Sequence, residues 1–347
     1  MMMNRTTTSR VTVPAFVGFI LSAPFPATTH AQQADRLVII ASSAAGTGYD
    51  AYARMLARHM PKHLPGNQTA IVNNMPGGAG IRAANYLYNV APKDGSTIAH
   101  VDRAIQTAPL LYGAESKAQF DATQFIQLGS VMRETGMVVL STQSPVNTLD
   151  EMRTTEIIVG ASGPEQDPAM YPRLLNQLSG SKFKIVYGYQ AQPDIFHAVE
   201  KGEVQGLFMS GWSGSGRAYV LDKVSKGEMK LLLQIAAVRD PKHPTTPTIL
   251  EVVPSPADRQ LVELLLSRLL LGRPFIAPPG VPADRVQALR TAFRKAVEDP
   301  ELIAEAAKTS LAIDAIWGEE AQRIIAENYK TDPAVIERVR KVIKVGN

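Results

Sequence analysis

The stretch LVIIASSAAGTGYDAYARMLARHM, residues 37–60, indicates the fold class of this 347-residue chain. Its apolar start, Leu37–Ala41, predicts a buried strand, and the small and polar residues 42–48 predict a loop. From Asp50 to about Met60 the sequence predicts a helix. A strand that leads through a loop into a helix is the repeating unit of α/β proteins with mostly parallel sheets.

The same alternation continues along most of the chain. A helix is expected around 81–89, and the sequence from Pro282 onward is almost wholly helical. Because a long helical tail must pack on a sheet, we expect it to return to the N-terminal part of the chain. Further strands are expected at 69–73, 97–101, 136–141, 157–160, 184–187, 204–209 and 230–236, and tail helices at 283–298, 300–308, 319–329 and 333–345.

This order predicts an α/β protein of two lobes, each a mostly parallel sheet flanked by helices. The first lobe is discontinuous, comprising residues 32–137 and 250–347, and the second lobe, residues 138–249, is inserted into it. Two segments of the chain then cross between the lobes.

Residues 1–31 have the layout of a secretory signal peptide. Arg5 and Arg10 precede an apolar run at 11–23, and small residues lead to a cleavage site after Ala31. The apolar run is too short to span a bilayer. The two arginines account for half of the net charge of +4. We therefore expect a soluble, exported protein.

Composition excludes several classes of protein. With 45% hydrophobic and 20% charged residues, the chain can bury large cores, and its length favours two domains. The absence of cysteine excludes a disulfide framework, a thiol nucleophile, a cysteine metal site and a lipid-anchored N-terminal cysteine. A nearly neutral charge without runs of lysine or arginine argues against a nucleic-acid partner.

The glycines Gly46 and Gly48 resemble a dinucleotide-binding turn, but the ribose-binding acid that should follow is missing. No Asp or Glu occurs between Asp50 and Asp94. Small residues at such a turn still allow backbone N–H groups to approach an anion. Similar turns recur at 160–163, 188–192 and 209–216, so we expect them to form a cleft for a small anion. The alternative is that each glycine only serves a tight turn.

Three side chains are individual candidates for ligand contact, each with a plain alternative. Arg103 follows a strand end, where its guanidinium could pair with a carboxylate; a surface salt bridge with Asp102 is the alternative. Asp167 stands at a helix start, so its alternative is N-capping. Trp212, in a loop rich in serine and glycine, either lines the cleft or packs in the core.

Enzyme and metal motifs are weak. The sequence Gly-x-Ser-x-Gly of serine hydrolases does not occur. His59 and His63 are four residues apart, but Pro61 stands between them and no HExxH motif accompanies them, so we expect surface residues. We expect no catalysis, cofactor or metal.

Four segments together resemble the Bug-type periplasmic substrate-binding proteins of tripartite tricarboxylate transporters. They are Gly48–Arg54, Asn74–Gly80, Ala91–Ile98 and Ala277–Ala283, the last followed by Arg285–Leu289 and Glu298–Glu301. The resemblance covers nearly the whole mature chain. It implies a Venus-flytrap fold whose lobes close on a small carboxylate.

The resemblance also implies partners and site residues. The protein would be a periplasmic monomer that delivers a small organic acid to membrane permease subunits; a secreted enzyme and a ligand sensor for a membrane signalling protein are alternatives. A carboxylate, an aromatic acid, an amino acid and an amide all stay open as ligands. Together with the candidates above, the expected ligand-binding residues are Ser42, Ser43, Ala44, Ala45, Gly46, Thr47, Asp102, Arg103, Ser162, Gly163, Gln166, Asp167, Tyr189 and Trp212.

Overall fold

The computed structural model describes residues 1, 36–66, 68–163 and 166–343. The described residues from 36 to 343 form one compact unit. Apart from Met1, the expected signal peptide lies outside the described residues. Among the helices that are described, none is long and apolar enough to cross a membrane.

The first sheet has six strands in the order β11-β4-β10-β3-β1-β2. β1 pairs in parallel with β2 and β3, whereas β10 runs antiparallel to β3 and β4, and β11 runs antiparallel to β4. The strands are β1 (Arg36–Ala41), β2 (Thr69–Asn74), β3 (Thr97–His100), β4 (Ile126–Ser130), β10 (Pro274–Ala277) and β11 (Ile316–Trp317).

The second sheet has five strands in the order β7-β6-β8-β5-β9. β6 pairs in parallel with β7 and β8, and β5 pairs antiparallel with β8 and β9. The strands are β5 (Gly136–Ser141), β6 (Ile157–Gly160), β7 (Phe183–Val186), β8 (Gly206–Met209) and β9 (Met229–Ile235).

Both sheets are therefore mixed, where the sequence predicts mostly parallel ones. Parallel neighbours need a crossover connection, and the expected strand–helix units supply it. β5 and β10 instead follow segments that come from the other sheet: β5 follows residues 131–135, and β10 follows α8 and α9. Both strands run antiparallel to their neighbours.

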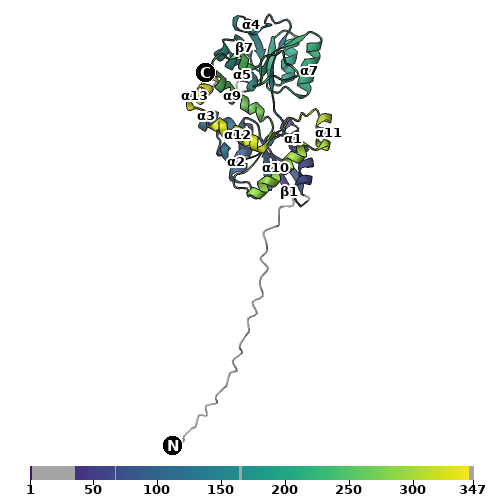
Figure 1. The fold of residues 1–347 in the computed structure, drawn as a ribbon, viewed down its shortest axis with the longest axis vertical. Helices are drawn as coiled ribbons and strands as arrows, with labels where there is room; N and C mark the ends of the chain where they lie inside the picture. Colours follow the sequence, from purple (N-terminus) through teal and green to yellow (C-terminus); the bar gives the residue numbers. More distant parts are fainter. Residues whose placement is uncertain (2–35, 67, 164–165, 344–347) are drawn as a thin grey trace. The chain divides into compact units, whose positions relative to one another are not determined.

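Helices cover both faces of the first sheet (Figure 1). Leu37 and Ile39 of β1 belong to a core with α1, α10 and α11, whereas Ile40 belongs to a core with α2 on the opposite face. This alternation explains why β1 is apolar at nearly every position. The helices are α1 (Gly48–His59), α2 (Ile81–Asn89), α10 (Ala283–Val297), α11 (Pro300–Lys308) and α12 (Gly318–Tyr329).

The second sheet is also covered on both faces. Val138 of β5 packs in a core with α5 and α9, and Val139 packs on the other side with α6 and α7. The helices of this part are α4 (Leu149–Thr154), α5 (Asp167–Ser179), α6 (Gln192–Glu200), α7 (Gly214–Ser225), α8 (Ile249–Val252) and α9 (Pro256–Leu270).

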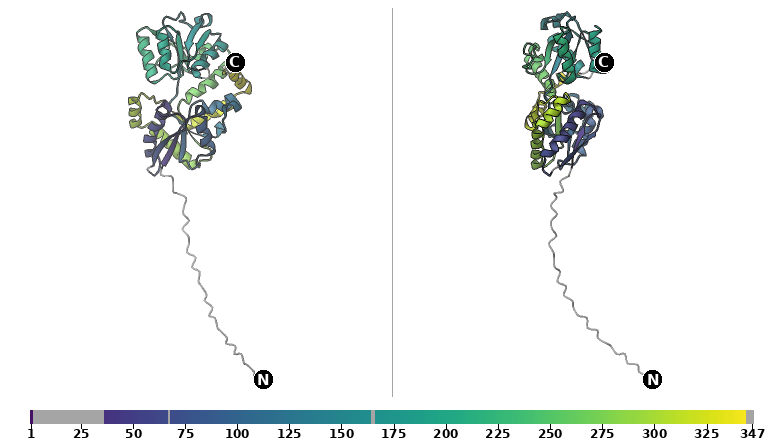
Figure 2. Two further views of the ribbon diagram at one scale, coloured as in Figure 1. Left: turned by 180° about the vertical axis from the view of Figure 1, so that it is seen from behind. Right: turned by 90° about the vertical axis from the view of Figure 1, so that its right-hand side faces the viewer.

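The last helix, α13 (Pro333–Ile343), differs from the expectation that the whole tail covers the first sheet. Its buried residues include Val335, Val339 and Val342, and they join the core formed by α5 and α9. The short helix α3 (Ala108–Tyr112) reaches the same core through Leu111. α13 packs against α3, α5 and α9, and Figure 2 shows the yellow end of the chain beside the green α9.

The chain passes from β4 to β5 through residues 131–135 and returns from β9 through α8 and α9 to β10. It leaves the first sheet again between α12 and α13. Lobe boundaries at residues 137/138 and 249/250 stay a prediction.

Candidate functional site

The loop after β1, residues 42–47, is held in shape by its own hydroxyl groups. Thr47 is the N-cap of α1, and its hydroxyl accepts a hydrogen bond of 3.3 Å from the Asp50 N–H. The same hydroxyl donates to the Ala44 carbonyl at 2.9 Å and lies 2.7 Å from the Ser43 hydroxyl. The loop is thus built before any ligand arrives.

Asp50 anchors this loop from the inside. Its buried carboxylate accepts hydrogen bonds from the Gly46 N–H at 2.8 Å, the Asn74 amide at 2.8 Å and the Arg54 guanidinium at 2.9 Å. Burial raises the pKa of Asp50, but the hydrogen bonds from Arg54 and Asn74 outweigh it and lower the pKa to about 2. Asp50 is therefore ionised at neutral pH and ties the loop to the end of β2.

The loops after β2 and β3 close around Ser42. Gly80 has φ +95°, and a Cβ there would lie 3.1 Å from both the Ser42 hydroxyl oxygen and Ile105. The Ser42 hydroxyl accepts a hydrogen bond of 3.0 Å from the Asp102 N–H. A left-handed residue without a side chain is required for this close approach.

Beyond these loops lies a network of five charged side chains, each at most 16% exposed. Arg103, after β3, pairs with Glu134 and, at 2.6 Å, with Asp167. Arg268 of α9 pairs with Asp167 at 3.3 Å, and Arg273, just before β10, pairs with Glu134 at 2.7 Å. Because Arg103 follows a strand of the first sheet and Asp167 begins α5, the network joins the two parts of the fold.

The two candidates predicted from charge, Arg103 and Asp167, therefore contact each other. Only 13% of the Arg103 side chain is exposed, and it pairs with Asp167 and Glu134, so the surface salt bridge with Asp102 is wrong. N-capping by Asp167 is also wrong, because Gln166 occupies the N-cap position of α5. Burial raises the pKa of Asp167, but the charges of Arg268 and Arg103 outweigh it and hold that pKa below its ordinary value.

Tyr49, in the first turn of α1, connects the charge network to the helix that follows the first loop, residues 42–47. Its hydroxyl donates to the Gly272 carbonyl at 3.3 Å and accepts from the Arg103 N–H at 3.2 Å. The Arg273 guanidinium carbon lies 4.2 Å from the centre of the Tyr49 ring. Burial, with a smaller contribution from the charge of Asp102, raises the pKa of Tyr49 to about 12, so the hydroxyl keeps its proton.

Two adjoining cavities lie around Arg103. The larger has a volume of about 590 Å³ and lies between the loops after β1, β2 and β3 and the start of α5. The smaller, about 360 Å³, extends toward Glu134, Gln192 and Arg273. Arg103 and Tyr49 line both. Both volumes lie in the range of small-molecule sites.

Half of the predicted ligand-binding residues line these cavities. The larger cavity is lined by Ser42, Ser43, Asp102, Arg103, Gln166 and Asp167, and Ser162 lines the smaller one. Seven others line neither: Ala44, Ala45, Gly46, Thr47, Gly163, Tyr189 and Trp212.

These seven residues fail to reach the cavities for physical reasons. Residues 44–47 lie on the exposed side of their loop, and Gly163 forms the turn before α5, where its carbonyl accepts from the Gln166 N–H. Tyr189 packs beside Gly160 on the core of α6. Trp212 is 4% exposed and packs edge-to-face on His243 at 5.6 Å, so its role is core packing.

Sequence reasoning missed several lining residues, namely Tyr49, Pro76, Gly77, Ala79, Gly80, Glu134, Arg268 and Arg273. One of them, Arg268, could have been predicted from the sequence. Arg268 is the only charge in LLLSRLLLG, residues 264–272, and a single arginine in an apolar helix predicts a buried charge with a partner. Glu134 and Arg273 lie in connectors without any local pattern.

A family model agrees with this architecture. The model of the tripartite tricarboxylate transporter family receptor, TctC, matches residues 52–340. The chain belongs to this family. The resemblance expected from the four sequence segments is confirmed.

Known relatives of this TctC-family chain span nearly its full length. A curated protein of Cupriavidus necator, described as the UPF0065 protein in the gbd 5′ region, is 25% identical over 351 residues, covering 97% of this chain and 98% of that protein.

Two solved structures share the fold. A TctC solute binding protein from Polaromonas, without ligand, has a TM-score of 0.68 at 20% identity, covering 87% of this chain and 98% of that one. MatC from Rhodopseudomonas palustris, with bound malate, has a TM-score of 0.56 at 20% identity, covering 89% of this chain and 99% of that one. The two-lobed α/β class is therefore confirmed.

Proposed function

We propose that this chain is a periplasmic solute-binding protein that captures a small organic acid and delivers it to the permease of a tripartite tricarboxylate-type transporter. The observation that carries the proposal is the cavity of about 590 Å³ whose wall combines Ser42 and Arg103 with Gln166 and Asp167. A site assembled from two sheets is completed only when both are in place, which suits capture by closure. Family membership and the malate bound to MatC support an organic acid as the ligand.

Unused hydrogen-bond donors at the cavities favour an acceptor-rich ligand. The buried Nε of Arg268, the buried Nε of Arg273 and the side-chain nitrogen of Gln192 have no hydrogen-bond partner among the described residues. All three residues line one of the two cavities. Each unpaired buried donor is unfavourable until an acceptor reaches it. A carboxylate offers two acceptor oxygens and can satisfy two such donors together.

Arg103 is already paired with carboxylates of the protein. Its guanidinium already pairs with Glu134 and Asp167, so a ligand carboxylate would join or replace a carboxylate of the protein. We propose that Arg103 fixes the two walls of the cavity relative to each other and donates one N–H to the bound acid. Ser42, Ser43, Asp102, Ser162, Gln166 and Asp167 complete the proposed contact set.

Calorimetric titration of the mature chain with mono-, di- and tricarboxylates, aromatic acids and amino acids tests the ligand class. We expect saturable binding of at least one organic acid. Arg103→Ala should weaken it at least tenfold, about 1.4 kcal/mol. Arg133→Ala, at an arginine whose side chain is 44% exposed, is the matched control and should change nothing. Failure of every acid to bind, or equal binding by Arg103→Ala, refutes the site.

Delivery and the absence of catalysis need separate measurements. Ligand released from the complex should be chemically unchanged when analysed by NMR, whereas an enzyme would return a product. Uptake of the radiolabelled acid into vesicles carrying the permease subunits should depend on added binding protein. Ligand binding without stimulated uptake would favour a sensor. Light scattering of the complex tests the expected monomer.

A further inference from the structure

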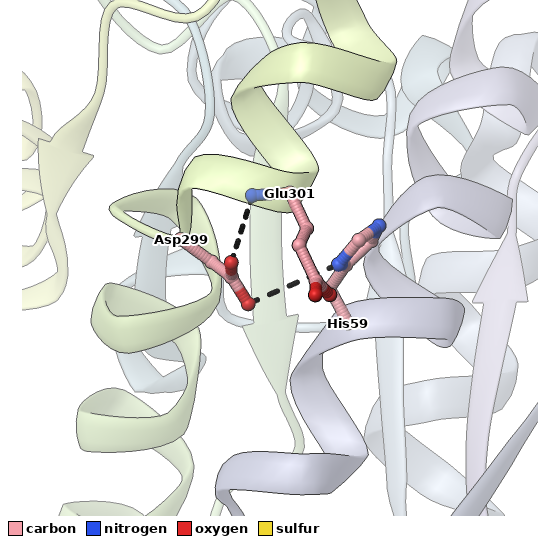
Figure 3. A group of neighbouring side chains, drawn as sticks. All are labelled: His59, Asp299 and Glu301. Atoms are coloured by element: carbon pink, nitrogen blue, oxygen red, sulfur yellow. Dashed lines mark hydrogen bonds and ion pairs between the residues drawn. The ribbon is translucent and has the colours of Figure 1, made fainter.

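A second polar cluster lies at the far end of α1 from the loop that follows β1. His59 ends α1, and Lys62 and His63 lie in the 3-10 turn Met60–His63 that follows it. All three lie near Asp299 or Glu301 at the start of α11. Figure 3 shows His59 facing the two acids. Pro61 stands in the first turn of this 3-10 helix, just after the end of α1. Both histidines lie near Asp299, and His59 is buried, so the expectation of surface residues is wrong for His59.

Two imidazole nitrogens approach the same carboxylate oxygen. His59 Nδ1 lies 4.0 Å and His63 Nε2 lies 3.6 Å from Asp299 Oδ2. Both nitrogens are buried and have no hydrogen-bond partner among the described residues. The His59 side chain is 9% exposed. Figure 3 shows His59 and Glu301 on the same side of Asp299, and the donor atoms of these three residues lie within 4.8 Å of one another.

Neighbouring hydrogen bonds orient the His59 ring and the Asp299 carboxylate as metal ligands. His59 Nε2 lies 2.9 Å from Glu305 Oε2; a hydrogen on Nε2 donated to that carboxylate leaves Nδ1 with its free lone pair. The second oxygen of Asp299 accepts from the Glu301 N–H at 2.9 Å, which orients the carboxylate.

A cation already occupies the middle of the cluster. The Lys62 ammonium lies 2.5 Å from Asp299 and 2.8 Å from Glu301. Its side chain is 38% exposed and flexible, so it can leave toward solvent. The position between the carboxylates therefore accommodates a positive charge. The two histidine nitrogens add lone pairs to which the Lys62 ammonium does not donate.

We propose that His59, His63, Asp299 and Glu301 bind a divalent transition-metal ion of the zinc type, in competition with Lys62. Mixed imidazole and carboxylate donors suit zinc, whereas magnesium and calcium prefer oxygen alone. Ligands at about 2.0–2.1 Å around tetrahedral zinc are about 3.4 Å apart. The donor atoms of His59, Asp299 and Glu301 lie within 4.8 Å of one another and His63 Nε2 lies 3.6 Å from Asp299, so binding would draw these side chains together. The ion would join α11 to the end of α1.

Calorimetric titration with zinc chloride tests this site, using full-length mature protein without a histidine tag, stripped with EDTA and dialysed. We expect one zinc ion per chain. His63→Ala and Asp299→Asn should each weaken binding at least tenfold, and Lys62→Met should strengthen it severalfold because the competing ammonium is gone. Cobalt as a probe should give visible absorption bands typical of a tetrahedral nitrogen and oxygen site.

His197→Ala is the matched control, because this histidine is 74% exposed and pairs only with Glu200 among the described side chains. It should bind zinc like the wild type. Circular dichroism and melting of each variant without metal check the fold, and His63→Ala carries the test if Asp299→Asn is destabilised. Absence of saturable zinc binding, wild-type affinity in His63→Ala, or loss of binding in His197→Ala overturns the proposal. Organic-acid binding is measured apart and is expected to survive all of these changes.

Discussion

The role of Asp50 as an anchor predicts a pH-dependent loss of stability in Asp50→Asn. The carboxylate accepts from Gly46, Asn74 and Arg54 at once. An amide of the same shape has one acceptor oxygen, and its NH₂ group would face one of these donors. The variant therefore leaves at least one buried N–H group without an acceptor, while the rest of α1 stays unchanged.

The size of the effect follows from the pKa of Asp50. A fall from 3.8 to about 2 in the folded protein corresponds to roughly 2.5 kcal/mol of stability. Because the folded pKa is depressed, this contribution is complete above about pH 4 and is lost as the pH falls toward 2. We expect Asp50→Asn to unfold with about 2–3 kcal/mol less free energy at pH 7 and to approach the wild type near pH 2.

Urea unfolding followed by circular dichroism between pH 7 and pH 2 measures both curves. Asp150→Asn, at a carboxylate that is 91% exposed, is the control and should stay within about 0.5 kcal/mol of the wild type. Equal stability of Asp50→Asn and wild type at pH 7 would refute the anchoring role. A deficit that is the same at pH 7 and pH 2 would show that the charge of Asp50 is not its source.

Three further changes test packing and backbone geometry. Gly80→Ala forces a left-handed alanine against Ser42 and should cost about 1–2 kcal/mol in urea unfolding and weaken organic-acid binding; an unchanged affinity would separate this loop from the site. Phe293→Ala, at a fully buried ring, should cost about 3–5 kcal/mol, and a cost below about 1 kcal/mol would contradict its place in the core. Thr148→Ala removes the capping box with Glu151 and should cost about 1 kcal/mol, whereas Thr148→Ser should restore most of it.

The structure confirms eight strands predicted from the sequence, among them β5 at 136–141, which follows no crossover helix; β4, β10 and β11 are not predicted. Leu37–Ala41 is apolar at nearly every position because β1 is buried on both faces, and that pattern is visible without the structure. β11 has only two residues, and β10 has four and starts at a proline. Their antiparallel pairing with β4 depends on a chain that returns from the second sheet, which no local pattern encodes.

The residues of the candidate site also include some that the sequence predicts and others that it does not. Arg103 and Ser42 could be found because they directly follow strands, where side chains collect at the sheet edge. Glu134 reaches the network only because its connector crosses between the sheets. Trp212 has the sequence context of an open loop, yet tertiary packing against His243 buries it. Local sequence identifies strand ends; it does not identify what packs over them.

The pairing of charges around the cavities has a kinetic consequence. Among the described lining residues, the three arginines Arg103, Arg268 and Arg273 are matched by three acids, Asp102, Glu134 and Asp167. A cleft without net charge exerts little long-range attraction on an anion, so electrostatic steering contributes little to the rate of encounter. The association rate should then be nearly independent of ionic strength, because salt screens an attraction that is already small. Such a protein captures its ligand at the same speed in dilute and in salty surroundings.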